Sequence, residues 1–480
     1  MRKSYLATIW SVLDRVWSQI VGLFIGIVLA RLLTPEDYGL VGISTIFITF
    51  SNVFIEAGFS NALIRKLDRT QTDYSTAFHF NVIMGVVMYL ALYISSPFIA
   101  DYFEDQQLVL LTRIVSITVI LNSLCIVQNA ILTAELRMKE QAFINIASQI
   151  PSGLVAIYLA YRGLGVYSLV VFSVLSAFIR TLMFWIVAKW LPTMEFSKES
   201  MSYLWGFGSK LIGANFLGTV FNEIYSVLIG KYVGKSDLGL YSKGRSLSTQ
   251  TDNICNGVVQ KVAIPLLSKY QGDTILLKEK YRDLTMMITC VMTLVSGILI
   301  VVARPLILLI WGEKWVETVP IFQILLLCNI VSNVQYLTLI ILQIVNHTEY
   351  TLKLEFIKKP VYLLVILLLL QFGLYGLLAA MFIVSLISTI VNMSAPSKYI
   401  GYTYIEQIKD VSKYLVAWVI GSVVVFSLSN FVQFNCVVDI VFRTIIMSLV
   451  YCAVLWGLRD SLFLDYIKKI QVYKKERYGF

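Results

Sequence analysis

The sequence predicts an all-α membrane protein that crosses the bilayer about fourteen times. Of its 480 residues, 58% are hydrophobic and only 14% are charged, whereas soluble proteins carry about 25% charged residues. The apolar residues fall in runs of about 18 to 25, and about 20 apolar residues suffice to span the hydrocarbon core. Because these runs lack the strict alternation of a membrane β-barrel, a helical bundle is the remaining class.

The predicted helices follow one another along the chain, with short polar connections between them. The first begins in a basic and then apolar stretch, MRKSYLATIW, that is typical of a signal peptide. Asp14 and Arg15 interrupt the run that follows, and no small-residue cleavage pattern appears, so we expect a retained first span. The predicted spans cover residues 9–33, 38–62, 75–99, 109–133, 143–160, 167–189, 207–230, 239–263, 286–310, 318–343, 353–371, 374–395, 413–431 and 437–457.

Lysine and arginine predict the orientation of these spans. The connections on one side, together with both ends of the chain, hold about three times as many basic residues as the other side, which is typical of cytoplasmic connections. We therefore expect both termini in the cytoplasm. This bias also accounts for the net charge of +10 without nucleic acid as a partner. The basic tail YIKKIQVYKKERYGF can lie on anionic membrane lipids or be an ordinary solvated tail.

An internal repeat divides the chain. The stretch LARLLTPEDYGLVG at residue 29 recurs as IGKYVGKSDLGLYS at residue 229, so that Asp37 aligns with Asp237 and Gly39 with Gly239. Both halves begin on the cytoplasmic side, as in parallel repeats that are related by an axis along the membrane normal. We expect one six-helix lobe in residues 1–200 and a pseudo-symmetric one in 201–400, around a central cavity. Residues 401–480 then hold two extra helices and the tail.

Four predicted helices, the first two of each half, carry polar residues along one face. In the second span these residues recur every three or four positions, and the eighth span repeats the pattern 200 residues later. Charge is expensive within a membrane, so such residues usually mark a pathway. The expected cavity residues are Arg15, Gln19, Asn52, Glu56, Asn215, Asn222, Arg245, Asp252 and Asn256. In the alternative interpretation these faces only hold helices together, for example through Arg15 with Glu56.

The cations and carboxylates of these faces predict different chemistry. The planar guanidinium of arginine can bind two oxygens of a phosphate at once, which makes Arg15 and Arg245 candidate phosphate ligands. Asp14 and Glu56 can bind a coupling cation or a proton. For Asp14, a role at a helix end or beside a neighbouring arginine is the preferred interpretation.

The sequence predicts neither an enzyme nor a cofactor. GKYVGKS has the wrong glycine spacing for a phosphate-binding loop, and no strand precedes it. With only two histidines and no CxxC pair, we expect no metal site. The connections on the outer side are too short for a soluble active site, so we expect no catalytic residues.

The sequence resembles a known family over essentially its whole length. WSVLDRVWSQIVGLFIGIVLARLLTPEDYGLVGIST resembles the N-terminus of bacterial exporters of polysaccharide repeat units, and EAGFSNALIRK, YVGKSDLGLYSKGRSLSTQ, VAIPLLSKYQGD and WGEKW extend the likeness. These exporters include the O-antigen, colanic acid and teichuronic acid flippases of the multidrug/oligosaccharidyl-lipid/polysaccharide superfamily. The resemblance implies two six-helix lobes around a cavity that opens alternately to each face. It also implies an undecaprenyl-pyrophosphate-linked oligosaccharide as substrate, flipped from the inner to the outer leaflet of the bacterial plasma membrane.

Three other functions stay open at this point. A cation-coupled multidrug exporter of the same superfamily would favour an acidic, aromatic pocket, against which the basic residues of the polar faces argue. A membrane polysaccharide polymerase or glycosyltransferase would be expected to have a sizeable outer loop. A scaffold role beside other polysaccharide-assembly proteins would explain the two extra helices but not the polar faces.

Overall fold

The structure is a computed structural model that describes residues 2–56, 58–333, 335–429, 434–460 and 462–465. Side chains at residues 2–9, 12, 15, 207, 210, 254–261 and 336 lie outside this description. The cationic side chain expected at Arg15, the amide expected at Asn256 and the basic tail therefore lie outside the described part of the molecule. Within it, almost every residue is helical, which confirms the predicted all-α class.

Contacts group the chain into two compact units, Met1–Ser242 and Lys243–Phe480. The helices of the first unit are α1 (Arg2–Leu32), α2 (Pro35–Glu56), α3 (Phe59–Arg65), α4 (Gln71–Tyr102), α5 (Gln107–Val115), α6 (Ile117–Ser123), α7 (Ile126–Ala134), α8 (Met138–Tyr161), α9 (Val166–Ala188), α10 (Lys198–Leu228) and the π-helical turn η1 (Ile229–Val233). The helix α11 (Lys235–Ser268) begins in the first unit and continues into the second.

The helices of the second unit are α12 (Thr274–Ile310), α13 (Thr318–Ser332), α14 (Gln335–Ile344), α15 (Glu349–Leu370), α16 (Gly373–Asn392), α17 (Ser394–Ile400), α18 (Tyr404–Ser429) and α19 (Cys436–Gly457), with a 3-10 turn η2 at Glu313–Trp315. The contact boundary at residue 242 differs from the repeat boundary expected at residue 200, because α10 packs on α2, α3 and α4. The division into two repeated lobes stays a prediction.

Eleven helical segments of the described residues are long and apolar enough to cross a membrane, and the chain is a multi-pass membrane protein. The remaining three predicted spans correspond to α1, α11 and α15, which are helices of 31, 34 and 22 residues. All three carry charged residues within their length, which lowers their hydropathy. The count of fourteen membrane crossings therefore stays a prediction.

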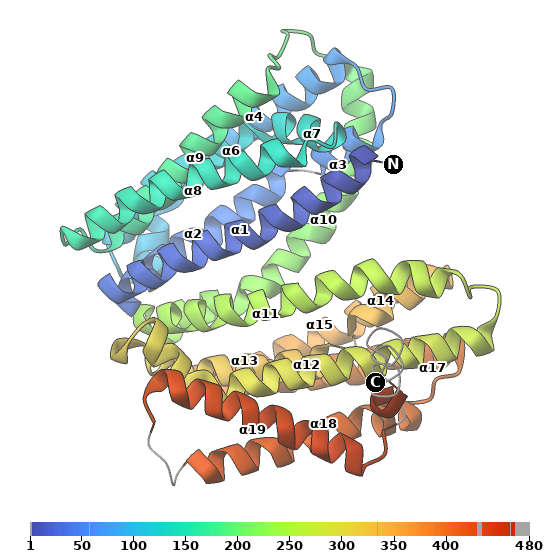
Figure 1. The fold of residues 1–480 in the computed structure, drawn as a ribbon. Coiled ribbons are helices and arrows are strands. Elements are labelled where there is room, and N and C mark those ends of the chain that lie inside the picture. The colour runs from blue at the N-terminus through green and yellow to red at the C-terminus, as the bar shows by residue number, and fades with distance from the viewer. Residues whose placement is uncertain (1, 57, 334, 430–433, 461, 466–480) are drawn as a thin grey trace. The chain divides into compact units, whose positions relative to one another are not determined.

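In the first unit, α1 lies beside α8, and α8 lies beside α9 (Figure 1). Ile25 of α1 fits against Gly153 of α8, where an added Cβ would lie 2.3 Å from the Ile25 Cδ1 atom. Close contact at small residues is how membrane helices associate, because lipid tails are as apolar as leucine side chains. The α10 helix contributes Leu204 to a core that includes Phe59 of α3 and Val127 of α7. This packing places α10 along α2, and both carry predicted cavity residues.

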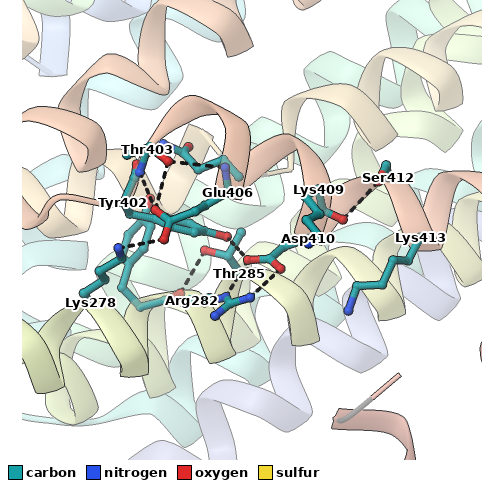
Figure 2. A network of polar contacts seen from close by, with 12 residues as sticks. Lys278, Arg282, Thr285, Tyr402, Thr403, Glu406, Lys409, Asp410, Ser412 and Lys413 are labelled. Carbon is teal, nitrogen blue, oxygen red and sulfur yellow. Dashed lines mark hydrogen bonds and ion pairs between the residues drawn. The ribbon is translucent and has the colours of Figure 1, made fainter. Parts of the chain in front are cut away.

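In the second unit, α12 packs on α13, α18 and α19, while α16 packs on α13 and α15. Figure 2 shows the polar network that joins the start of α12 to the start of α18. The Arg282 guanidinium donates to both carboxylate oxygens of Asp410, at 2.5 and 2.8 Å, and the Tyr402 hydroxyl donates to Asp410 at 2.8 Å. Lys278 donates to Glu406 at 2.9 Å. The two extra helices are thus fixed to the body of the unit by a bidentate ion pair.

Candidate functional site

The helices α2 and α10, which carry two of the predicted polar faces, pack against each other within the first unit. Phe216 of α10 lies against Phe50 and Phe54 of α2, with ring centroids 5.9 and 5.5 Å apart. Asn215, next to Phe216 on α10, is exposed. Asn52 is half-buried, and because it lies two residues from both Phe50 and Phe54 it faces away from this aromatic contact. Both side chains are carboxamides, which can donate to and accept from a polar ligand.

The carboxylate of Glu56 ends the polar face of α2, and its side chain is exposed. The guanidinium of Arg180 on α9 attracts it electrostatically, and Arg180 also donates from Nη2 to Asn122 Oδ1 of α6 at 2.5 Å. Arg180 and Glu56 therefore place a positive and a negative charge near each other in the first unit. Asn222 of α10 is exposed as well. Such groups on membrane helices require water or a polar ligand, because lipid cannot satisfy them.

Asp14 and Gln19 lie on α1, and both side chains are half-buried. The Asp14 carboxylate accepts from Asn145 Nδ2 of α8 at 3.2 Å and from the Ser18 hydroxyl at 3.2 Å. These hydrogen bonds link α1 to α8, which matches the helix-linking interpretation that the sequence favours for Asp14. A role of Asp14 or Glu56 in ion coupling stays a prediction.

The remaining predicted residues belong to the second unit. Arg245 and Asp252 of α11 are half-buried, and each has an interaction partner. They lie seven residues apart on one helix, so both occupy the same face. The shared cavity that would join this face to those of α2 and α10 stays a prediction.

The two copies of the repeat motif meet within the first unit, where α2 and α11 begin. An added Cβ at Gly39 would lie 1.7 Å from the Lys235 carbonyl oxygen, and one at Gly239 would lie 1.8 Å from that of Pro35. The backbones can approach so closely only because both positions are glycine. The sequence repeat therefore corresponds to a reciprocal helix crossing, which alignment of the motifs alone did not predict.

Ion pairs surround this crossing. Lys235 Nζ lies 2.7 Å from the Glu36 carboxylate and 2.6 Å from that of Asp105, and these hydrogen bonds raise the pKa of the Lys235 ammonium. Lys231 donates to Glu104 at 2.7 Å and lowers the pKa of that carboxyl group. These ion pairs hold the first turns of α2 and α11 and the turn η1 to the connection before α5.

One group of charged residues was missed by sequence reasoning. The predicted span 353–371 contains Glu355, Lys358 and Lys359 of α15. The two lysines were included among the basic residues of a cytoplasmic connection when the spans were oriented, so no role within the membrane was predicted for them. In the structure Lys358 is only 5% exposed, and it donates to Glu355 and to Asn392 Oδ1 of α16. The glutamate three residues before the lysine is the sequence signal that could have revealed this pair.

Comparison with known proteins gives one family and several relatives. A family described as "Polysaccharide biosynthesis protein" matches residues 28–320. The teichuronic acid biosynthesis protein TuaB of Bacillus subtilis (strain 168) is 28% identical over 285 residues, which is 58% of this chain and 59% of that protein. The succinoglycan biosynthesis transport protein ExoT of Rhizobium meliloti (strain 1021) is 23% identical over 322 residues, which is 66% of this chain and 64% of that protein. Each alignment thus spans less than two thirds of the relative's length.

Two solved structures share the fold. A structure titled as the lipid II flippase MurJ in an inward closed conformation superposes with a TM-score of 0.72 at 16% identity, covering 95% of this chain and 100% of that one. An inward-facing transporter of the multidrug resistance MATE family gives a TM-score of 0.61 at 14% identity, covering 82% of this chain and 94% of that one. At these identities the likeness establishes the fold.

Proposed function

Because this chain belongs to the family of polysaccharide biosynthesis proteins, we propose that it is a flippase for a lipid-linked oligosaccharide. The substrate is an undecaprenyl-pyrophosphate-linked repeat unit, which moves from the inner to the outer leaflet of the bacterial plasma membrane. The observation that carries this proposal is the set of exposed and half-buried polar side chains on α2 and α10 of a membrane protein. The relatives named for teichuronic acid and succinoglycan biosynthesis support the substrate class.

The physical task of such a protein is to carry a charged, hydrated head group across hydrocarbon. A hydrated groove lined by Arg15, Arg245 and carboxamides lowers the free-energy cost of moving the head group, while the lipid tail stays in the bilayer. The arginines bind the pyrophosphate or acidic sugars through paired hydrogen bonds. Moving two negative charges outward across 100 mV, inside negative, releases about 4.6 kcal/mol. The alternative energy source for transport is counter-transport of a proton or another cation at Asp14 or Glu56.

The crossing of α2 and α11 supplies the closure that alternating access requires. With both termini in the cytoplasm, the connections that hold Glu36, Glu104 and Lys235 face outward. We assign the Gly39–Gly239 crossing, with its ion pairs, as the outer closure of the transport path. Separation of the two helices at these glycines then opens the path to the outer leaflet.

A cation-coupled multidrug exporter is the second candidate, and the fold shared with a MATE transporter favours it. The family match favours the flippase instead, because that family is described by polysaccharide biosynthesis. The two candidates differ in a simple observable. Loss of a flippase blocks polysaccharide assembly, whereas loss of a drug exporter raises drug sensitivity and leaves the polymer intact. Other polysaccharide-assembly proteins are expected partners only in the first case.

The phosphate role of the two arginines is tested in a strain that lacks the gene. We expect Arg15→Ala with Arg245→Ala to lower the delivery of lipid-linked units to the outer leaflet at least about tenfold, the effect of losing one charge-assisted hydrogen bond. An impermeant lectin on oriented vesicles measures that delivery. Arg162→Ala, which removes an exposed arginine outside the four polar faces, is the matched control. Wild-type delivery by the double variant at equal expression would refute the role of these arginines.

A further inference from the structure

An arginine of the first unit is held in a fixed position between α4 and α5. Arg113 of α5 is half-buried, and its Nε–H donates to the Ser96 hydroxyl of α4 at 2.9 Å. The guanidinium carbon lies 4.2 Å from the centre of the Tyr93 ring, which is close enough for a cation–π contact. Ser96 is fully buried, and its hydroxyl donates to the Tyr93 carbonyl at 2.8 Å. One hydrogen bond and one aromatic face therefore orient the guanidinium.

The positive charge of Arg113 is not matched by a carboxylate. Among the described residues Arg113 forms no ion pair. In the connection between α4 and α5, Glu104 pairs with a lysine of η1 and Asp105 with a lysine of α11. A guanidinium has five N–H donors, and only the one on Nε has a hydrogen-bond acceptor among the described residues. The two terminal nitrogens can therefore donate to a ligand.

The surface around Arg113 is apolar and exposed. Leu110 and Ile117 lie three residues before and four residues after Arg113 on the same face of α5, and they are 49% and 36% exposed. On α4, Leu90 and Ile94 are 49% and 67% exposed. Both segments are long and apolar enough to cross a membrane, so we expect these side chains to contact lipid. A cation on such a surface is costly unless it reaches a polar group.

The position of Arg113 along the helices brings lipid headgroups within its reach. The α4 helix ends at Tyr102 and α5 begins at Gln107. Arg113 and Ser96 each lie six residues from these ends, or about 9 Å along a helix. The headgroup layer on each side of the hydrocarbon core is about 5–8 Å thick. With the connection between the helices in the headgroup layer, the guanidinium lies near the boundary between headgroups and hydrocarbon.

We propose that Arg113 binds the phosphate group of an anionic phospholipid. The planar guanidinium can donate two parallel hydrogen bonds to two phosphate oxygens. An anionic lipid is favoured over a zwitterionic one, because the ammonium group of the latter would be repelled by the uncompensated charge of Arg113. Arginines near helix ends usually extend freely toward the headgroups, whereas Ser96 and Tyr93 hold this one and so reduce the entropy cost of binding. The proposal does not depend on the proposed function.

The test uses the full chain purified into phosphatidylcholine nanodiscs that contain increasing fractions of phosphatidylglycerol. Thermal unfolding measures stabilisation by the lipid, and native mass spectrometry counts the phosphatidylglycerol molecules that stay bound. Arg113→Met removes the guanidinium and keeps a long, unbranched side chain. Arg162→Met is the matched control, because Arg162 also lies near a tyrosine ring, that of Tyr158 at 5.9 Å, but its guanidinium has no hydrogen-bond acceptor among the described residues.

We expect Arg113→Met to weaken the binding of one phosphatidylglycerol by about tenfold or more, and Arg162→Met to bind as the wild type does. Arg113→Lys keeps the charge but loses the planar fork, so it should also weaken binding. The proposal is overturned if the wild type retains no phosphatidylglycerol, or if both methionine variants lose binding equally, which would indicate a general effect of charge. Equal stabilisation by inorganic phosphate in pure phosphatidylcholine would overturn the assignment to a lipid.

Discussion

A methyl group at Gly39 would lie 1.7 Å from the carbonyl oxygen of Lys235, and no rotation of a side chain can relieve that clash. Three residues later, a methyl group at Gly42 would lie 3.4 Å from the Ser242 hydroxyl, which is ordinary van der Waals contact. The two glycines occupy the same helix, and they differ in how close the neighbouring chain lies to the added methyl group. They therefore separate the effect of the close crossing from the effect of helix propensity.

We predict that Gly39→Ala destabilises the protein by about 1–3 kcal/mol, the usual cost of overpacking, because α2 and α11 must move apart. Gly42→Ala should be neutral or slightly stabilising, since alanine favours the helix over glycine by about 1 kcal/mol. Thermal unfolding in detergent measures both. Equal unfolding midpoints for the two variants would mean that the crossing contributes nothing to the stability of this conformation.

Sequence spacing predicted polar residues on shared helix faces, because the helical period is set locally by backbone hydrogen bonds. Asn52 and Asn215 were placed in this way on the two helices that pack together. Spacing could not predict that Asn145 approaches Asp14, because the rotation of α8 about its axis depends on packing against α1. It also could not distinguish Lys358 inside the bundle from a lysine in a connection, since both fit a position near the end of a span.

The polar network of Figure 2 shows how whole elements are held in place. Asp410 is 2% exposed and accepts from Arg282 of α12 and from Tyr402, which precedes α18. Asp460, after α19, is 1% exposed and accepts from Lys413 of α18 at 2.5 Å. These contacts fix α18 to α12 and the end of α19 to α18. The sequence predicted this helix pair but not its attachment, because residues 128 apart form the key ion pair.

We predict that Arg282→Met lowers the free energy of unfolding by about 1.5–3 kcal/mol, because it leaves the buried Asp410 carboxylate without its charged donor. Lys280→Met, two residues earlier, removes only exposed pairs with Glu279 and Asp283 and should change stability by less than about 1 kcal/mol. Chemical denaturation in detergent measures the difference. If the two variants are equally stable, the ion pair of Arg282 does not fix α18 to α12.

The sequence predicted the order of the helices better than it predicted the positions at which a span is interrupted. The predicted spans 109–133 and 318–343 each correspond to more than one helix, α5 to α7 and α13 with α14. The Ser116 hydroxyl donates to the Arg113 carbonyl at the first of these breaks, and serine side chains that bond locally to the backbone compete with regular helix. Hydropathy does not register such breaks, because apolar residues continue through them.

For the whole molecule, hydropathy predicted a helical membrane protein of the observed class. This succeeded because a lipid environment leaves few alternatives to helices. The hydrogen bond of Lys358 to Asn392 and the crossing at Gly39 join segments that are distant in the sequence. Those contacts depend on shape and backbone approach, which a hydrophobic pattern does not encode.

As the proposed flippase, this chain should move a lipid-linked oligosaccharide between leaflets without another protein. The most direct test places the purified protein in liposomes whose undecaprenyl-pyrophosphate-linked oligosaccharide carries a label, and then adds an impermeant glycosidase outside. We predict that all of the labelled lipid becomes accessible, against about half in protein-free liposomes, where only the outer leaflet is exposed. If accessibility stays at the protein-free level with folded protein, with or without an imposed membrane potential or proton gradient, the proposed flippase activity is refuted.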